Sequence, residues 1–202
     1  MKITGVLGGS FNPIHYAHLA MARCAHEQFK IPEILIMPTA ATYYKEGSTL
    51  IYPELRMDMI RLAINEINAG DYMKPSYIDL DRGGVTYTYD TINDLKKLYD
   101  KIYFIVGTDS LMYIDKWQKA GSFLPECTLL VAVRNGCAED DVKVQRDYLI
   151  DNYGAEIHFL NMKILPLSSS DIRKRIKLKQ SVEGMLPDSV IDYIMKKNLY
   201  TE

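Results

Sequence analysis

The sequence predicts an α/β protein built on a doubly wound parallel sheet. Short apolar runs rich in Ile, Val and Leu alternate along the chain with longer amphipathic patterns of helical period. Runs of this composition are typical of strands buried on both faces, and strand–helix alternation favours right-handed parallel crossovers. With 202 residues the chain is long enough for one substantial core, so we expect a single domain over residues 1–202.

The expected elements follow one another in regular order. Strands are expected at Ile3–Leu7, Ile34–Met37, Lys74–Ile78, Ile102–Val106, Thr128–Val133 and Glu156–Leu160. Helices are expected at Ala17–Phe29, Pro53–Asn68, Tyr89–Tyr99, Asp141–Tyr153, Asp171–Leu178 and Pro187–Lys197. We expect residues 168–202 to form a small C-terminal helical part packed on the sheet domain. Ligands of such sheets bind beyond the carboxyl ends of the strands.

The composition of the chain excludes several classes of protein. Hydrophobic residues make up 48% and charged residues 25%, and the formal net charge is -2. This balance argues against a general surface for nucleic acid or anionic membranes. No apolar run has bilayer length, and we find no signal-peptide pattern. The scattered Cys24, Cys127 and Cys137 fit a reducing compartment, so we expect a cytoplasmic protein.

The string from Gly8 to His18 is the most informative part of the chain. It joins the first expected strand to the first helix, so a glycine turn would point backbone N–H groups and a helix dipole at phosphate. His15 and His18 stand one helical turn apart and share a face. The alternatives are a plain tight turn, a solvated histidine pair and half of a zinc site. Zinc is disfavoured because Cys-x-x-Cys and His-Glu-x-x-His motifs are absent, and the length of the string favours phosphate handling.

Two common nucleotide-binding schemes do not fit this chain. The first turn lacks Gly-x-Gly-x-x-Gly, and Pro38-Thr39-Ala40 stands where a dehydrogenase has an acidic residue after its second strand. No Walker A loop occurs either. The sequence therefore predicts a nucleotide site of another kind.

A second phosphate site is predicted at Ser168-Ser169-Ser170 and Arg173. Hydroxyl groups at a helix start satisfy unpaired backbone N–H groups, so plain helix capping is the alternative. We expect Arg173 in the first turn of the helix, an unfavourable place for a cation unless an anion binds nearby.

Further polar strings are candidates for substrate contacts. Gly107-Thr108-Asp109 ends the fourth strand, where Asp109 either caps the next helix or accepts hydrogen bonds from a ribose. Trp117 either packs in the core or offers a flat face to a ring. Thr86 and Tyr87 precede a helix, either as part of a turn and cap or as a ligand loop.

Together these strings resemble the nicotinate mononucleotide adenylyltransferase family, within the HxGH nucleotidyltransferase group, nearly end to end. Gly8–His18 resembles the first family signature, and Ser168–Arg173 resembles its Ser-Ser-Thr-x-x-Arg element. Gly107–Leu111 with Trp117 matches the middle motif, and Thr86–Thr91 matches the substrate loop.

The chain departs from the family pattern at three places. Ala17 replaces the glycine of the HxGH string, and Ser170 replaces a threonine. Thr42-Tyr43-Tyr44-Lys45 stands where the family usually has Pro-Pro-His-Lys, so only Lys45 is kept as a phosphate-contact candidate.

The resemblance implies a Rossmann-like nucleotidyltransferase fold and a reaction between ATP and nicotinate mononucleotide. The products would be nicotinate adenine dinucleotide and pyrophosphate, and the reaction would be a step of NAD biosynthesis. Mg²⁺ would be bound mainly through the ATP phosphates, without a protein metal site. A related adenylyltransferase acting on nicotinamide mononucleotide or phosphopantetheine, or a non-catalytic adenine-nucleotide sensor, are the alternatives. A homo-oligomer is left open.

The resemblance also assigns roles to particular residues. The catalytic residues would be His15, His18 and Arg173. The residues that bind ATP would be Gly8, Gly9, Ser10, Phe11, His18, Gly107, Asp109, Ser168, Ser169 and Arg173. The residues that bind the mononucleotide would be Ser10, Phe11, Lys45, Thr86, Tyr87, Trp117 and Arg134.

Overall fold

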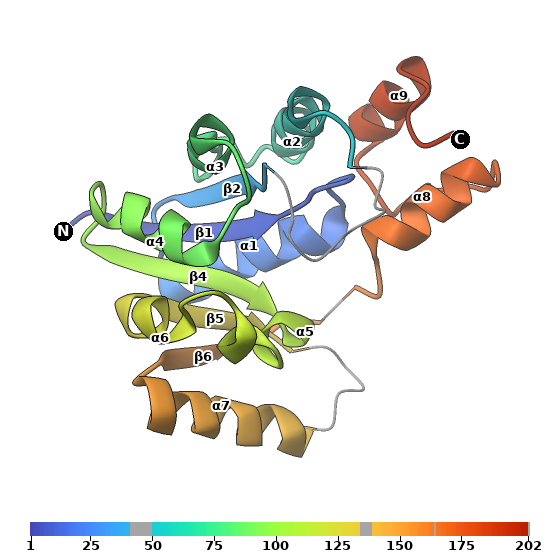
Figure 1. The fold of residues 1–202 in the computed structure, drawn as a ribbon. Coiled ribbons are helices and arrows are strands. Elements are labelled where there is room, and N and C mark those ends of the chain that lie inside the picture. Colours follow the sequence, from blue (N-terminus) through green and yellow to red (C-terminus); the bar gives the residue numbers. More distant parts are fainter. Residues whose placement is uncertain (41–49, 134–138, 164, 202) are drawn as a thin grey trace.

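A six-stranded sheet with every strand parallel forms the centre of the molecule (Figure 1). The structure is a computed structural model that describes residues 1–40, 50–133, 139–163 and 165–201. The strand order is β3-β2-β1-β4-β5-β6. The strands are β1 (Ile3–Gly9), β2 (Ile34–Pro38), β3 (Met73–Pro75), β4 (Lys101–Gly107), β5 (Thr128–Ala132) and β6 (Glu156–Leu160). The predicted doubly wound α/β fold is confirmed.

Helices connect the strands and cover both faces of the sheet. The longer ones are α1 (Tyr16–Phe29), α2 (Pro53–Glu66), α4 (Thr88–Lys96), α7 (Glu139–Tyr153), α8 (Ser169–Lys177) and α9 (Asp188–Lys196). The short ones are α3 (Ile78–Arg82), α5 (Thr108–Leu111), α6 (Ala120–Phe123), η1 (Ile114–Lys116) and η2 (Leu124–Glu126). None of the helices in the described ranges is long and apolar enough to cross a lipid bilayer.

Successive strand residues point into two separate hydrophobic cores. Val6 of β1 packs with residues of α4, α6 and α7, whereas its neighbour Leu7 packs with residues of α1, α2, α8 and α9. The same alternation recurs at Leu35 and Ile36 of β2. Because side chains alternate across a strand, a continuous apolar run fills both cores. The C-terminal helices α8 and α9 thus share a core with the first strand.

The structure corrects the prediction around the first glycine pair. The strand was expected to end at Leu7, but β1 continues through Gly8 and Gly9, which pair with Met37 and Pro38 of β2. The turn comes later, where Phe11 has a left-handed backbone with φ of 43°. The paired backbone of Gly8 and Gly9 continues the sheet, and the turn therefore begins beyond the strand pair.

The segment after β3 also differs from the prediction. The expected strand Lys74–Ile78 stops at Pro75, and α3 begins at Ile78. Within α3, Asp79 forms an ion pair with Arg82 three residues later. In a helix, this spacing places both side chains on the same face. The short helices α5 and α6 were not predicted, because four residues are too few to carry a helical period.

The strand order places a crevice between β1 and β4. The chain runs outward from β1 through β2 to β3, and outward in the opposite direction from β4 through β5 to β6. At such a switch point the connections at the carboxyl ends of the two central strands lead to opposite faces of the sheet, which leaves room for a ligand. Gly8 and Gly9 end β1, and Gly107 ends β4.

Arg56 of α2 is a buried cation that ties together the loops at this edge. Its side chain is fully buried. The guanidinium donates hydrogen bonds to the carbonyl oxygens of Ser10 at 2.9 Å, Thr39 at 2.8 Å and Ile51 at 3.2 Å. These carbonyls follow β1, follow β2 and precede α2. One side chain therefore sets the spacing of three segments around the crevice.

We predict that Arg56→Met destabilises the protein by at least about 3 kcal/mol, because three buried carbonyl oxygens lose their donor. Urea unfolding followed by circular dichroism would measure the change. Arg61→Met is the matched control on the same helix, since Arg61 is half exposed and pairs with Asp58 at the surface. It should cost less than about 1 kcal/mol. Equal effects of the two substitutions would contradict the structural role of Arg56.

Candidate active site

Two adjoining cavities lie at the carboxyl edge of the sheet. The first, here called the histidine cavity, has a volume of about 380 Å³ and is bordered by the start of α1, the end of β4 and the start of α8. The second, the threonine cavity, has a volume of about 310 Å³ and is bordered by β2, the segment before α4 and the residues that follow η1. Both are lined by Gly8, Ser10, Phe104, Ser110 and Trp117. Two ligands bound in them would meet beside the end of β1.

His15 and His18 form a stacked pair in the histidine cavity. His15 is the N-cap of α1, and its backbone N–H donates to Nδ1 of His18 at 3.3 Å. The two rings stack with centroids 3.7 Å apart and planes 19° from parallel, and Phe11 packs edge-on against His18 at 5.0 Å. Because Nδ1 of His18 accepts a hydrogen bond, the neutral ring carries its proton on Nε2. His18 is therefore prepared to donate a hydrogen bond from Nε2.

Both imidazoles are neutral at pH 7 in the protein without ligand. Burial lowers the pKa of His15 from 6.5 to about 4, opposed in part by a backbone hydrogen bond. Burial also lowers the pKa of His18 well below 6.5, and the nearby His15 lowers it further.

The start of α8 is anchored to the loop that follows β1. Ser168 caps the helix, its hydroxyl accepting from the backbone N–H of Asp171 at 3.1 Å. Ser169 donates to the carbonyl oxygen of Pro13 at 2.8 Å, and Arg173 donates to that of Asn12 at 2.8 Å. Ser168 and Ser169 line the histidine cavity. The C-terminal segment thus completes a wall of the site.

Arg173 occupies a different place from the one predicted. The helix begins at Ser169, so Arg173 lies in the second turn of α8, not in the first. Its guanidinium lies outside the lining of both cavities and contacts the Asn12 carbonyl and the Ser170 hydroxyl. Arg173 therefore contacts the loop after β1, at the edge of the site.

The end of β4 supplies the opposite wall of the histidine cavity. Gly107 and Asp109 line it, as predicted from their position at the end of a strand. Thr108 donates from its hydroxyl to the carbonyl oxygen of Ala132 at 3.1 Å and so joins the ends of β4 and β5. This bond fixes the backbone from which Asp109 projects.

The threonine cavity combines an aromatic wall with hydroxyl groups. Trp117 stands edge-on to Phe104 with ring centroids 6.4 Å apart. Thr86 and Tyr87 line the cavity from the segment before α4. Thr39 also lines it, and its hydroxyl is buried without a hydrogen-bond partner within the described ranges. Such a cavity suits a flat ring that carries polar groups.

Most of the predicted site residues meet at these two cavities. Phe11 is an exception, because its side chain is fully buried beneath His18. Lys45 and Arg134, together with the atypical string Thr42–Lys45, lie outside the described residues. Ser110 and Asp79 line the cavities but were not predicted. Asp79 was missed because it directly follows the expected strand Lys74–Ile78 and was assigned to no element, although its i,i+3 spacing to Arg82 could have indicated a helix.

The donor set of the site does not form a metal centre on its own. Among the residues that the structure describes, no group of three or more His, Cys, Asp or Glu side chains could hold a metal ion. Asp109 is the one carboxylate among the described residues that line the histidine cavity. These residues alone do not supply the oxygen ligands that a hard divalent cation needs.

Comparisons with known proteins find relatives along the whole chain. The family model described as cytidylyltransferase-like matches residues 6–175. A Clostridium botulinum protein named "Probable nicotinate-nucleotide adenylyltransferase" is 35% identical over 202 residues, covering 100% of each chain. A Dehalococcoides mccartyi protein of the same name is 36% identical over 200 residues, covering 98% of this chain and 96% of the relative.

A solved structure extends the similarity to the fold. Plasmodium falciparum nicotinic acid mononucleotide adenylyltransferase complexed with NaAD superposes with a TM-score of 0.78 at 23% identity. The superposition covers 99% of this chain and 98% of that one. At this level of identity the comparison establishes a shared fold.

We predict that His15 makes the stability of the protein dependent on pH. Its pKa is about 4 when folded and 6.5 when unfolded, so the unfolded state takes up the proton first as the pH falls. The free energy of unfolding therefore keeps its full value above pH 6.5 and falls as the pH is lowered to about 4. The loss attributable to His15 amounts to about 3 kcal/mol. Urea unfolding of wild type and His15→Asn across this range would measure it.

The expected result is that the difference in unfolding free energy between wild type and His15→Asn shrinks as the pH is lowered. His158→Asn, which removes a half-exposed histidine of β6, is the control and should follow the wild-type pH dependence. Parallel curves for wild type and His15→Asn would show that His15 is not held neutral by burial.

Proposed function

We propose that this chain, which belongs to the cytidylyltransferase-like family, is a nicotinate-nucleotide adenylyltransferase. It joins ATP and nicotinate mononucleotide to give nicotinate adenine dinucleotide and pyrophosphate. The full-length relatives support this assignment at 35–36% identity. The reaction requires two nucleotide sites that meet at the reacting phosphates.

The observation that carries the proposal is the shared wall between the two cavities. Gly8 and Ser10 border both of them, at the end of the central strand. We place ATP in the histidine cavity, with its triphosphate toward His15, His18 and the α8 serines. The nicotinate ring lies in the threonine cavity against Trp117. The 5′-phosphate of the mononucleotide and the α-phosphate of ATP then come together near Gly8 and Ser10.

The chemistry needs alignment and charge stabilisation more than proton transfer. An oxygen of the mononucleotide phosphate, already an anion at neutral pH, forms a bond to the α-phosphorus of ATP. The bond from this phosphorus to the bridging oxygen breaks, and pyrophosphate leaves with the electron pair. No general base is required, because the nucleophile carries no proton that must be removed. The enzyme contributes by holding the two phosphates in line and by placing donors around them.

His18 is the donor best placed to act on the transferring group. Its Nδ1 is occupied by the backbone N–H of His15, so Nε2–H is available to a phosphate oxygen. Ser168 and Ser169 border the same cavity and bind the β- and γ-phosphates in this proposal. Arg173 adds positive charge at the edge of the triphosphate site. Asp109 faces the adenosine side.

The mononucleotide is held by the threonine cavity. Thr39 has a buried hydroxyl without a partner in the described chain, which suits a hydroxyl or phosphate oxygen of this substrate. Thr86 and Tyr87 border the ring with Trp117. Lys45 remains a proposed phosphate contact and Arg134 a proposed mononucleotide contact, both outside the described ranges.

Mg²⁺ fits this site as an ion carried by the substrate. With Asp109 as the one carboxylate lining the described part of the histidine cavity, most oxygen ligands would come from ATP phosphates and water. Such an ion neutralises part of the triphosphate charge. His18 and the α8 serines then position the phosphates by hydrogen bonding.

Release of pyrophosphate from ATP in the presence of nicotinate mononucleotide tests the proposed function directly. Phosphopantetheine and nicotinamide mononucleotide are the comparison substrates, and ATP alone is the blank. We expect product with the pyridine mononucleotide and none with phosphopantetheine. Binding of ATP without release of pyrophosphate from any substrate would favour a nucleotide sensor and contradict the proposal.

We predict that His18→Ala lowers kcat by about 10²–10³-fold, the effect of removing one preorganised donor to a developing charge. The KM values should change far less, because the interaction strengthens in the transition state. Steady-state kinetics with both substrates would measure this. His158→Ala, on the exposed side of β6, is the control and should retain wild-type kcat. A near-normal kcat for His18→Ala would exclude its catalytic role.

We predict that the acid mononucleotide is preferred over the amide by at least about tenfold in kcat/KM. In this proposal, backbone N–H groups near Trp117 and Thr86 donate to the carboxylate, whereas an amide must present its own NH₂ to one of them. Competition between the two mononucleotides at limiting ATP would give the ratio directly. A ratio near one would contradict a carboxylate-binding pocket.

A further inference from the structure

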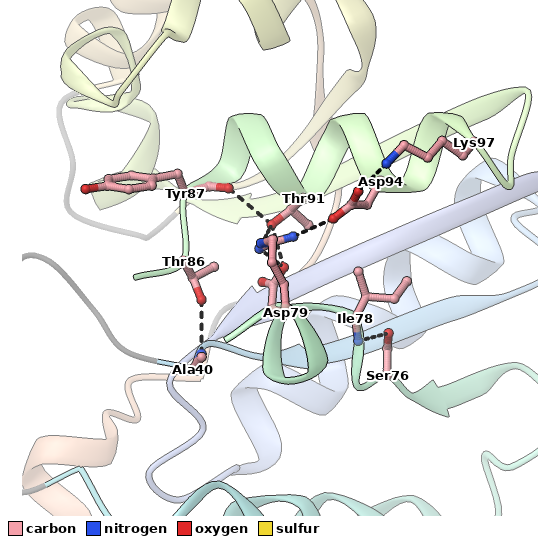
Figure 2. A network of polar contacts seen from close by, with 10 residues as sticks. Ala40, Ser76, Ile78, Asp79, Thr86, Tyr87, Thr91, Asp94 and Lys97 are labelled. Carbon is pink, nitrogen blue, oxygen red and sulfur yellow. Dashed lines mark hydrogen bonds and ion pairs between the residues drawn. The ribbon is translucent and has the colours of Figure 1, made fainter. Parts of the chain in front are cut away.

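The segment between α3 and α4 is held at both ends by a buried polar network. Figure 2 shows this network, which joins Asp79 of α3 to Thr91 of α4 across the intervening loop. The loop, residues 83–87, leads from Gly83 and Gly84, both with positive φ, to Thr86 and Tyr87 in the wall of the threonine cavity. Its two ends are therefore joined by side chains that also line the threonine cavity.

The centre of the network is a short hydrogen bond between two buried groups. The Thr91 hydroxyl donates to Oδ1 of Asp79 at 2.7 Å and also lies 3.3 Å from the carbonyl oxygen of Tyr87. Asp79 and Thr91 are both only 3% exposed. The position of the Tyr87 backbone is thus linked to a carboxylate twelve residues away from Thr91 in the sequence.

Arg82 supplies the positive charge that this buried carboxylate requires. It pairs with Asp79 at 2.5 Å and with Asp94 at 2.8 Å. Lys97 forms an outer ion pair with Asp94 at 2.7 Å. Burial raises the pKa of Asp79, and the hydrogen bonds from Thr91 and Arg82 oppose that rise. With its charge balanced by Arg82, the carboxylate can border a cavity that takes an anionic substrate.

The loop is also attached to the segment that follows β2. The hydroxyl of Thr86 accepts a hydrogen bond from the backbone N–H of Ala40 at 3.0 Å, directly after β2 (Figure 2). The loop is therefore held by Asp79 and Thr91 in the two flanking helices and by Ala40 at Thr86. Such a loop presents its backbone donors in one arrangement, with little freedom to adapt to a different ligand.

We propose that Asp79 and Thr91 are positioning residues that fix the 83–87 loop and thereby set the preference of the threonine cavity for an acid over an amide mononucleotide. This inference rests on the proposed function for its substrates. Their side chains act through Tyr87 and Thr86, since the Thr91 hydroxyl and the Asp79 carboxylate are bound to each other. In a looser loop the backbone N–H donors can rearrange around the amide, so the free-energy penalty for binding the amide mononucleotide falls.

Thr91→Val tests this because it removes the hydroxyl while keeping the shape of the side chain. We expect the KM for the acid mononucleotide to rise and the acid-to-amide ratio of kcat/KM to fall, each by about tenfold, the effect of one lost hydrogen bond. The KM for ATP should stay within about twofold, and Thr91→Ser should restore the wild-type ratio to within about twofold. Asp79→Asn should change the ratio in the same direction as Thr91→Val.

A second readout needs no substrate. Amide hydrogen exchange at Ala40 in the ligand-free protein should become about tenfold faster in Thr91→Val, because Thr86 is held less firmly against it. Lys97→Ala is the matched control, since it breaks the exposed outer ion pair and leaves Asp79 and Thr91 bonded. It should leave both the Ala40 exchange rate and the acid-to-amide ratio unchanged.

The outcomes separate the positioning role from the proposed function. An unchanged exchange rate and an unchanged acid-to-amide ratio in Thr91→Val would overturn the positioning role. An equal rise of the KM for ATP would also overturn it, since that indicates general loosening of the site. If the wild-type protein used neither mononucleotide, the proposed function would fail, and the exchange experiment alone would still decide whether Thr91 holds the loop.

Discussion

The buried guanidinium of Arg56 is the constraint on which the site depends. It binds the carbonyl oxygens of Ser10, Thr39 and Ile51, and burial lowers its pKa. Ser10 and Thr39 are also walls of the threonine cavity. A planar group with five N–H donors can bind several carbonyls in fixed directions, which a lysine ammonium cannot do. The distance between the ends of β1 and β2 is therefore set from within the core.

Around this fixed edge, the proposed site for a highly charged substrate is lined mainly by neutral donors. His15 and His18 are kept neutral by burial, and the α8 serines are neutral as well. Neutral donors of this kind remain in place before the substrate arrives, because no charged side chain has to be desolvated to bind the phosphate. The stacking on His15, the Phe11 ring and the His15 backbone bond fix the His18 ring, which we propose donates to phosphate.

Distant parts of the chain complete one another at this edge. Ser169 binds the Pro13 carbonyl across 156 residues of sequence, and Arg173 binds that of Asn12 across 161. The hydrogen bond between Asp79 and Thr91 likewise joins two segments, α3 and α4, beside the threonine cavity, across twelve residues of sequence. A reaction between two nucleotides requires both cavities to keep their relative position, and bonds of this kind join them to one sheet edge.

The sequence by itself determined the local elements and the family. The alternation of apolar runs and helical periods is a property of short windows, so β6 and most of α1, α4 and α8 could be predicted closely. The Gly8–His18 string identified a nucleotidyltransferase, and full-length relatives confirm that resemblance. Only the tertiary structure decided that the glycine pair continues β1, that Asp79 lies on a helix and faces Thr91, and that Arg56 binds Ser10 and Thr39. These contacts depend on how segments separated by tens to hundreds of residues pack against one another. The hydrophobic period of one segment carries no information about which distant partner its polar groups will contact.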